Sequence, residues 1–333
     1  MTDPLVEVVM PTVGRPSLGE ALAPLVGRIP VVVVDDRRGD VPPLGVPAGV
    51  RVVRSGGRGP AAARNAGWRA SRATWVAFLD DDVRPPGGWV GALQRDLARC
   101  AADVGATQGQ LVVPLPTDRR PTDWERSTAG LESAVWATAD LAYRRETLLA
   151  AGGFDERFPR AYREDADLGL RVTDAGWRIV RGTRHVEHPV RPARWTQSLH
   201  SQRGNADDVL MRALHGPDWR ARAHVPAGRR RWHLATTAAL LLSLAGAVGG
   251  SRRTAVAGGA AWLALTADLV ARRVGPGPRT PAEVAAMTAT SLVLPLAAAG
   301  WWLTGWLRLP ALLCQPGPVP AEVAGEAAVR GSA

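Results

Sequence analysis

The stretch Trp75-Val76-Ala77-Phe78-Leu79-Asp80-Asp81-Asp82 decides the fold, because an apolar strand pattern runs directly into three carboxylates. An unpaired buried carboxylate is strongly destabilised, so the strand must end where the charges begin. We expect Asp80 to Asp82 to form the floor of a polar site, since ligands collect at the carboxyl ends of strands in α/β sheets. Oxygen ligands suit Mg²⁺ or Mn²⁺ ions that substrate phosphates also hold. Taken alone, the stretch is equally typical of a solvated acidic turn.

The segments on either side alternate between strand and helix patterns. Short β-branched runs cover residues 6–10, 29–34 and 50–53, and helical patterns cover residues 17–25 and 61–71 between and after them. Alternation of this kind is typical of a parallel sheet. The sequence therefore predicts an α/β fold, doubly wound, with its site at the strand ends.

Composition narrows the classes of partner. The chain has 333 residues, enough for about two domains by length, and a net charge of +10. All 41 basic residues are arginines, and they are scattered without a compact basic element interleaved with aromatic residues, which argues against a nucleic-acid partner. A membrane surface or a phosphorylated substrate fits this charge better. Cys100 and Cys314 are isolated and predict neither a metal site nor a disulfide framework.

Beyond about residue 225 the chain becomes apolar. Runs at 234–250 and 255–271 are near the lower limit for crossing a bilayer, and the run at 285–307 is longer and ends in tryptophans, which suit a membrane interface. The first two runs can instead form a shallow hairpin. We expect a catalytic domain at 1–225, two or three membrane-associated helices at 226–310 and a disordered tail at 311–333.

The start of the chain and its basic residues predict where the first domain lies. No secretory signal pattern precedes the first strand, so we expect that domain in the cytoplasm. Arg229-Arg230-Arg231 stand before the first apolar run and predict the same side for the catalytic domain. Arg252-Arg253 and Arg272-Arg273 also place positive charge in both later loops. The number of spans is therefore left open.

Five motifs, in this order, resemble the family 2 glycosyltransferases of the GT-A fold. The resemblance covers roughly residues 6 to 190 and rests on Val8-Val9-Met10-Pro11-Thr12, Val33-Val34-Asp35-Asp36, Gly59-Pro60-Ala61-Ala62-Ala63-Arg64-Asn65-Ala66-Gly67, Phe78-Leu79-Asp80-Asp81-Asp82 and Tyr162-Arg163-Glu164-Asp165-Ala166-Asp167-Leu168. It implies an inverting transfer of a sugar from a nucleotide diphosphate donor, with Mg²⁺ or Mn²⁺ as cofactor.

The resemblance also implies roles for particular residues. Asp35 or Asp36 matches the acid that contacts the nucleoside, Arg64 a residue near base and phosphates, and Pro11 and Asp81 complete the donor side. Asp80 and Asp82 match the outer positions of an Asp-x-Asp signature, with Asp82 as the direct metal ligand. His188 falls where some related enzymes supply a further metal or phosphate contact, although a lone histidine is more often structural.

On the acceptor side, Asp165 matches the catalytic base, which must lie within hydrogen-bond reach of the acceptor hydroxyl. Glu164 and Asp167 match positions that orient the helix start or contact the acceptor, and Asp140 stands where an asparagine is common. An isolated Glu-Asp pair at a helix N-terminus is also ordinary helix chemistry.

Two departures and two alternatives remain. Arg37-Arg38 replace the usual small residues after the nucleoside acid. Arg194-Trp195 lacks the Gln three residues before Arg194 that would complete a Gln-x-x-Arg-Trp motif, so single-sugar transfer is favoured over polymerisation. The acceptor is predicted to be a lipid-linked or cell-envelope glycan. One alternative is a nucleotidyltransferase, which would have a glycine-rich, basic triphosphate loop near the N-terminus that Gly14-Arg15 resembles only weakly. The other is a non-catalytic membrane scaffold that binds nucleotide-sugar.

Overall fold

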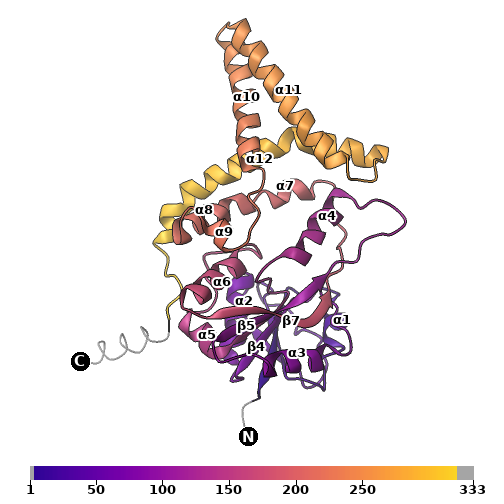
Figure 1. The fold of residues 1–333 in the computed structure, drawn as a ribbon, viewed down its shortest axis with the longest axis vertical. Helices are drawn as coiled ribbons and strands as arrows, with labels where there is room; N and C mark the ends of the chain where they lie inside the picture. The colour runs from indigo at the N-terminus through magenta and orange to yellow at the C-terminus, as the bar shows by residue number, and fades with distance from the viewer. Residues whose placement is uncertain (1–3, 321–333) are drawn as a thin grey trace, which may run out of the picture.

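The computed structural model describes residues 4–320, and its centre is one mixed sheet of seven strands (Figure 1). The strand order is β3-β2-β1-β4-β6-β5-β7, and β6 runs antiparallel to both of its neighbours. The other pairings are parallel, as the alternation of strand and helix patterns predicts. The strands are β1 (Val6–Thr12), β2 (Val31–Asp35), β3 (Arg51–Arg54), β4 (Trp75–Leu79), β5 (Val104–Val112), β6 (Asp140–Arg144) and β7 (Arg178–Glu187).

Both faces of the sheet are apolar, and helices cover each of them. Val9 and Phe78 belong to one buried cluster, which includes α2 (Pro60–Ala70), whereas Val8 and Leu79 belong to the other, with α1 (Leu18–Leu22) and α3 (Trp89–Ala98). Successive strand residues point to opposite faces, so a strand covered on both sides is apolar throughout. Burial on both faces explains why the central strands read as continuous apolar runs.

The parallel register brings three strand ends to one edge. Val9 of β1 lies opposite both Val32 of β2 and Phe78 of β4. The carboxyl ends of β1, β2 and β4 therefore lie side by side, and the polar residues that follow each of them meet above the sheet. This confirms the predicted α/β fold with polar groups gathered at the strand ends.

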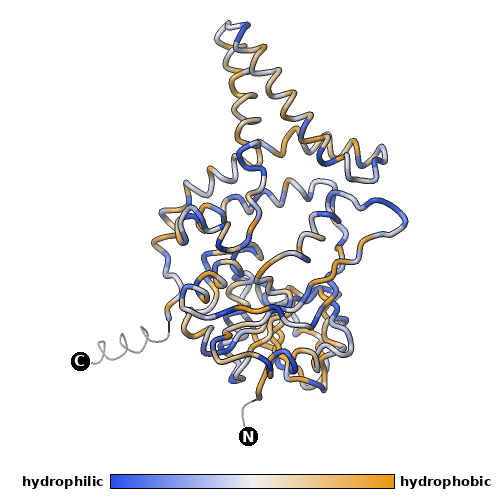
Figure 2. The backbone as a smooth tube through the Cα atoms, in the orientation of Figure 1, coloured by the Kyte–Doolittle hydropathy of each residue, from blue (hydrophilic) through white to orange (hydrophobic). Residues whose placement is uncertain are grey.

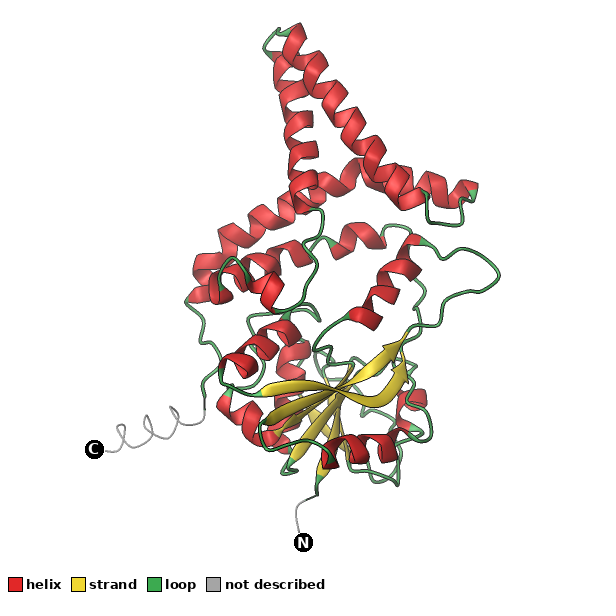
Figure 3. Cartoon of the chain, in the orientation of Figure 1, coloured by secondary structure: helices red, strands yellow, loops and turns green. Residues whose placement is uncertain are grey.

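A layer of shorter helices lies between this edge and the C-terminal helices (Figure 3). Helices of this layer line the site on the side away from the sheet. They come from the chain after β5, after β6 and after β7. Its elements, with α5 at the side of the sheet, are α4 (Asp123–Ala129), η1 (Gly130–Ser133), α5 (Arg145–Ala150), α6 (Glu164–Asp174), α7 (Gln197–Ser201), α8 (Gly204–His215) and α9 (Trp219–Arg222).

Asp140, expected on the acceptor side, lies instead in the interior of the sheet. Its carboxylate is fully buried, accepts a 2.7 Å bond from Arg184 Nε and accepts a second bond from Trp89 Nε1. Gly109 leaves the room for it, since a Cβ there would lie 2.0 Å from the Asp140 carboxylate. Asp140 is therefore the partner of the buried Arg184. This ion pair accounts for an aspartate at position 140 without any contact to an acceptor.

The C-terminal segment forms three long helices, α10 (Arg230–Val248), α11 (Arg252–Val274) and α12 (Pro281–Leu313). The helices α10 and α11 pair as a hairpin that projects from the molecule, while α12 crosses below its base and packs on α7 and α8 (Figure 1). Within residues 4–320, α11 and α12 are long and apolar enough to cross a membrane. The first predicted run, 234–250, falls in α10, which does not meet that measure.

The predicted disordered tail begins inside a helix. Residues 311–313 complete α12, where Leu309 and Leu312 pack against the core of the α/β domain. Residues 314–320 continue along that domain, and a Cβ on Gly152 would come within 3 Å of the Val319 backbone. The rest of the predicted tail, residues 321–333, lies outside the described residues.

Gly67 tests the close approach of α2 to the sheet. A Cβ at Gly67 would lie 2.3 Å from Val9 Cγ1 and 2.9 Å from Val34 Cγ2, both on buried strands. We expect Gly67→Ala to lower the free energy of unfolding by about 1–3 kcal/mol through overpacking. Gly19→Ala is the matched helical control, because nothing lies within 4 Å of its Cβ position. Urea unfolding of both variants in detergent is the measurement, and equal stabilities would contradict the close contact.

Asp140 provides a second stability test. We expect Asp140→Ala to cost about 3–5 kcal/mol of unfolding free energy, because it leaves the buried Arg184 charge without this partner. Asp103→Ala removes the carboxylate of an exposed pair with Arg178 and should leave the unfolding midpoint unchanged. A small effect for Asp140→Ala would show that Asp96, the other carboxylate on Arg184, compensates fully.

Candidate functional site

A cavity of about 660 Å³ opens at the edge where the strand ends meet. Residues from both halves of the α/β domain line it, so segments far apart in the sequence share one space. Most of the predicted site residues are among them, namely Pro11, Asp36, Arg64, Asp80, Asp81, Asp82, Glu164, Asp165 and His188. Asp35, Asp140 and Asp167 do not line this cavity.

Each of the three adjacent carboxylates after β4 binds a different arginine. Asp80 Oδ1 accepts a 2.9 Å bond from Arg64 Nη2, and Asp82 Oδ2 lies 3.0 Å from Arg191 Nε. Asp81 accepts a bond from Arg15 and a 2.6 Å bond from the Thr12 hydroxyl.

The three carboxylates differ in exposure. The Asp80 side chain is 28% exposed, whereas that of Asp81 is 1% exposed. Burial raises the pKa of Asp81, and its bonds to Thr12 and Arg15 oppose that rise. Asp80 is therefore the most open of the three to a ligand, and Asp81 ties the loop to the end of β1.

Asp35 and Asp36, the two adjacent acids at the end of β2, have different surroundings. Arg37 binds Asp35 through two side-chain bonds of 2.8 Å, and these bonds hold the pKa of that buried carboxyl below its usual value. Asp36 faces the cavity and accepts bonds from Ser55 Oγ and from the Gly59 amide, at 2.6 and 3.0 Å. Asp36 is therefore the one of the two that a ligand in the cavity can contact. Asp35 is already bound by Arg37, which stands where a small residue is usual.

Arg64 joins the two halves of the cavity. Its guanidinium is buried, and it donates to Asp80 on one side and to Glu164 Oε1, at 2.8 Å, on the other. Burial, followed by the negative charge of the neighbouring Asp165, raises the pKa of Glu164, and Arg64 opposes the rise. Arg64 therefore fixes the start of α6 relative to the carboxylates after β4.

Asp165 stands in the first turn of α6 and faces the same cavity. One of its oxygens accepts a 2.8 Å bond from the Ala166 amide, and no cation forms an ion pair with it among residues 4–320. Burial raises its pKa. Arg163, just before the helix, has a left-handed backbone with φ 78°, and Asp208 holds its side chain at 2.9 Å. A carboxylate with a raised pKa that faces a cavity can accept a proton.

Asp167 points the other way on the same helix. Its carboxylate is bound by Arg171 at 2.6 Å and by His215 Nε2 at 2.8 Å. Both partners lower its pKa. Asp167 therefore secures α6 to α8, which agrees with the expectation that it orients the helix and not with contact to an acceptor in this cavity.

Asp82 and His188 form the part of the cavity that fits a divalent cation. His188 Nε2 lies 3.9 Å from Asp82 Oδ1, and two ligands of one ion are separated by at most about 4.2 Å. The other ring nitrogen of His188 is buried without a hydrogen-bond partner among the described residues. No group of three or more His, Cys, Asp or Glu side chains within residues 4–320 is arranged to hold a metal by itself. Such a site needs oxygens from a bound substrate, as Mg²⁺ sites on phosphates do.

Arg191 and Arg15 are residues of the site that sequence reasoning missed. Neither belongs to one of the five motifs, and the sequence pointed to Arg15 only as a weak resemblance to a triphosphate-binding loop. Arg191 lies in the loop after β7, and its backbone carbonyl accepts a 2.9 Å hydrogen bond from Trp124 Nε1. Only the folded chain places these side chains opposite Asp81 and Asp82, so no local pattern marks them.

The family model described as Glycosyl transferase family 2 matches residues 7–137. Two curated relatives, both pre-mycofactocin glycosyltransferases of Mycobacterium tuberculosis (strains CDC 1551 / Oshkosh and ATCC 25618 / H37Rv), are 31% identical over 135 residues. The match covers 37% of this chain and 28% of each relative, so this chain spans less than a third of their length.

The solved structures to which this chain is similar include mycobacterial proteins. A mycobacterial protein is 19% identical with a TM-score of 0.46, over 68% of this chain and 76% of that chain. Glucosyl-3-phosphoglycerate synthase from Mycobacterium tuberculosis is 18% identical in its complex with phosphoglyceric acid, with a TM-score of 0.43, over 68% and 82% of the two chains. The same enzyme with Mn²⁺, UDP-glucose and phosphoglyceric acid has a TM-score of 0.42 at 16% identity, over 68% and 81%.

The family match covers the strands that build the floor of the cavity, from β1 to the segment before β6. It includes Asp36, Arg64 and the three carboxylates after β4, and ends before α6. The part of the chain that matches the model described as Glycosyl transferase family 2 is therefore the part that builds the floor of the cavity.

Proposed function

We propose that this protein transfers a sugar from a nucleoside diphosphate-sugar to an acceptor held at a membrane, with inversion at the sugar. One observation carries the proposal. A single cavity brings together the carboxylates after β4, the buried Arg64 and the carboxylate Asp165, which come from three separate segments. The match of residues 7–137 to the glycosyl transferase family 2 model supports the same reaction.

The donor would occupy the side of the cavity formed by β1, β2 and α2. Asp36 is the carboxylate there that faces the cavity, where it can accept bonds from a nucleoside. Arg15 and Arg191 line the same space, and arginine binds phosphate oxygens in a bidentate geometry. Arg191 is half exposed and can turn from Asp82 toward a diphosphate.

Mg²⁺ or Mn²⁺ fits beside this donor, and Asp82 would hold it together with Asp80 or His188 and the diphosphate oxygens. When bound, the ion would neutralise the negative charge that develops on the leaving nucleoside diphosphate. The chain itself supplies two ligands at 3.9 Å from one another, Asp82 and His188. The remaining coordination would come from substrate and water.

Asp165 would take the proton from the acceptor hydroxyl. Burial raises the pKa of Asp165, which makes it a stronger base than an ordinary aspartate. Attack with inversion needs the acceptor on the face of the sugar opposite the diphosphate. Asp165 is carried by α6, a different segment of the cavity wall from β1 and β2, where the donor would bind.

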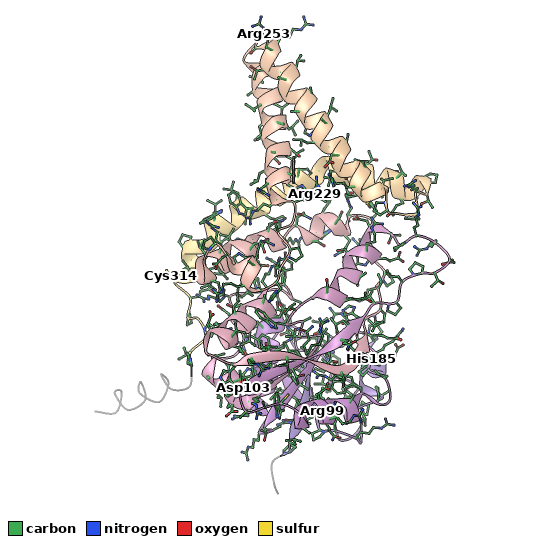
Figure 4. The ribbon with its side chains drawn as sticks, viewed as in Figure 1. Arg99, Asp103, His185, Arg229, Arg253 and Cys314 are labelled. Carbon is green, nitrogen blue, oxygen red and sulfur yellow. The ribbon has the colours of Figure 1, made fainter. Side chains whose placement is uncertain are left out.

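The C-terminal helices would hold this domain at a membrane. The 19 residues of α10 and the 23 of α11 rise about 28 and 34 Å, close to the 30 Å hydrocarbon core of a bilayer. Hydrophobic residues recur along the hairpin among residues of intermediate hydropathy, and hydrophilic residues lie at its base and tip (Figure 2). Arg253 lies at the tip and Arg229 at the base (Figure 4). We propose that the hairpin spans the bilayer.

The helix α12 would lie along the surface of the membrane. One of its faces packs on α7 and α8, and its opposite face exposes Leu296, Leu303 and Leu307. Five arginines stand at the base of the hairpin against two at its tip, which by the positive-inside rule favours a cytoplasmic catalytic domain. The base arginines are Arg229, Arg230, Arg231, Arg272 and Arg273, and the tip arginines are Arg252 and Arg253.

Two active-site variants test the reaction. We expect Asp165→Asn to lower transfer by about 10²–10⁴-fold while donor binding stays within a few-fold, because only the base is lost. Asp82→Ala should weaken donor binding in the presence of Mn²⁺ and lower transfer as well. Released nucleoside diphosphate is the readout, across a panel of donors. The acid limb of the rate profile should lie above the usual aspartate pKa and disappear in Asp165→Asn.

Asp103→Asn is the matched control, since Asp103 is exposed and forms a pair with Arg178 far from the cavity. It should retain full activity. Full activity of either active-site variant would contradict the mechanism. Release of pyrophosphate instead would indicate nucleotidyl transfer, and tight donor binding without turnover would indicate a scaffold.

Cysteine labelling tests the membrane arrangement. After Cys100 and Cys314 are replaced by serine, a single cysteine is placed at Arg253 or at Asp103, at opposite ends of the molecule (Figure 4). With a membrane-impermeant maleimide, Arg253→Cys should react in intact cells and Asp103→Cys only in inverted vesicles. Reaction of both residues from the same side would rule out a spanning hairpin.

A further inference from the structure

A second cavity, of about 780 Å³, lies between the α/β domain and the C-terminal helices. Its walls come from α4, the loop after β7, α7 and the facing sides of α10, α11 and α12. It shares four residues with the first cavity, so the two spaces adjoin: Trp124, Ser127, Arg191 and Ser201. A molecule in the second cavity can therefore reach the site where the donor would bind.

One wall of this second cavity is apolar. Leu269 of α11 and Met287 and Leu294 of α12 are all buried and line it. Trp195, which is 61% exposed, stands at the side of the loop after β7. These residues continue toward the hairpin that we place in the bilayer. The apolar wall suits a hydrocarbon chain and not a free sugar.

The other lining residues are strongly basic. Five arginines line the cavity against three carboxylates: Arg126, Arg191, Arg194, Arg229 and Arg273 against Asp123, Glu125 and Glu283. The carboxylates already have partners. Asp123 binds Arg273 at 2.8 Å, Glu125 binds Arg119 at 2.7 Å, and Glu283 accepts a bond from the Asp123 amide.

Two of the arginines remain available for an anion. Arg194 is exposed and forms no ion pair within the part of the chain that the structure describes, and Arg191 is 50% exposed with only Asp82 as its partner. Guanidinium groups bind phosphate oxygens in a fork, and basic pockets beside membrane helices bind anionic lipid headgroups. The chemistry of the cavity is therefore that of an amphiphile with a phosphate group.

We propose that this second cavity binds the acceptor as a phosphate-bearing lipid whose headgroup also carries the acceptor hydroxyl, with the phosphate on Arg191 and Arg194 and the hydrocarbon along α11 and α12. The proposal rests on the proposed function, because it assigns the acceptor of that reaction. Arg191 belongs to both cavities, so its guanidinium would lie between the donor diphosphate and the lipid phosphate and could bind both. Arg194 acts only in the second cavity.

Binding of short alkyl phosphates to the full-length protein in a non-ionic detergent tests this assignment. We expect octyl phosphate to bind more tightly than hexyl phosphate, by about threefold to fourfold for each additional buried methylene. Inorganic phosphate should bind at least 100-fold more weakly than octyl phosphate. Equal affinity for inorganic and octyl phosphate would overturn the lipid assignment, and so would the absence of any alkyl phosphate binding.

The variant Arg194→Gln locates the site. It should weaken octyl phosphate binding about tenfold, because one charge-assisted bond is lost. Arg99→Gln makes the same charge change at the far end of the α/β domain and should leave binding within twofold (Figure 4). Unchanged binding in Arg194→Gln, or equal losses in both variants, would overturn the proposal.

Donor binding separates this proposal from the proposed function. Arg194→Gln should bind the nucleotide-sugar and hydrolyse it as the wild type does, since Arg194 does not line the first cavity. If the wild type neither binds nor hydrolyses any donor, the proposed function fails. If donor turnover is normal and octyl phosphate binding ignores Arg194, only the acceptor assignment fails.

Discussion

Three adjacent carboxylates at the end of a buried strand are the constraint on which the rest of this structure depends. Negative charges this close together at the border of a core need counter-charges, and each one finds a separate arginine. Arg64 comes from α2, Arg15 from the loop after β1, and Arg191 from the loop after β7. Satisfying one short acidic turn therefore draws three distant segments around a single cavity.

Arg64 extends this arrangement to the acceptor side. Arg64 is buried between Asp80 and Glu164 and donates a hydrogen bond to each. These two bonds fix the first turn of α6 relative to the end of β4. Asp165 lies next to that contact and faces the cavity with a raised pKa, while Asp167 faces the other way and ties α6 to α8. One helix thus presents a proton acceptor and holds its own position with a neighbouring carboxylate.

The layer of α7, α8 and α12 relates the site to the apolar hairpin. On Gly305 of α12 a Cβ would come within 2.8 Å of the Ala206 carbonyl, so α12 lies directly against α8. A helix packed this closely on the α/β domain does not cross a bilayer without leaving that domain. The helix α12 is rich in apolar residues because one of its faces packs on α7 and α8, and it also contacts α10 of the hairpin.

The sequence by itself determined the α/β class, the strand ends and nine of the residues that line the cavity, because strand burial and the positions of charged residues are local properties. It did not separate Asp36 from Asp35, since that choice depends on how Arg37 folds back. It left open whether Asp167 orients α6 or contacts the acceptor, and it placed Asp140 on the acceptor side. The partners that hold Asp140 and Asp167, which are Arg184 and His215, are 44 and 48 residues away. Only the tertiary structure decided which arginine meets each of the three carboxylates, because those contacts form when separate loops converge over the same strand end.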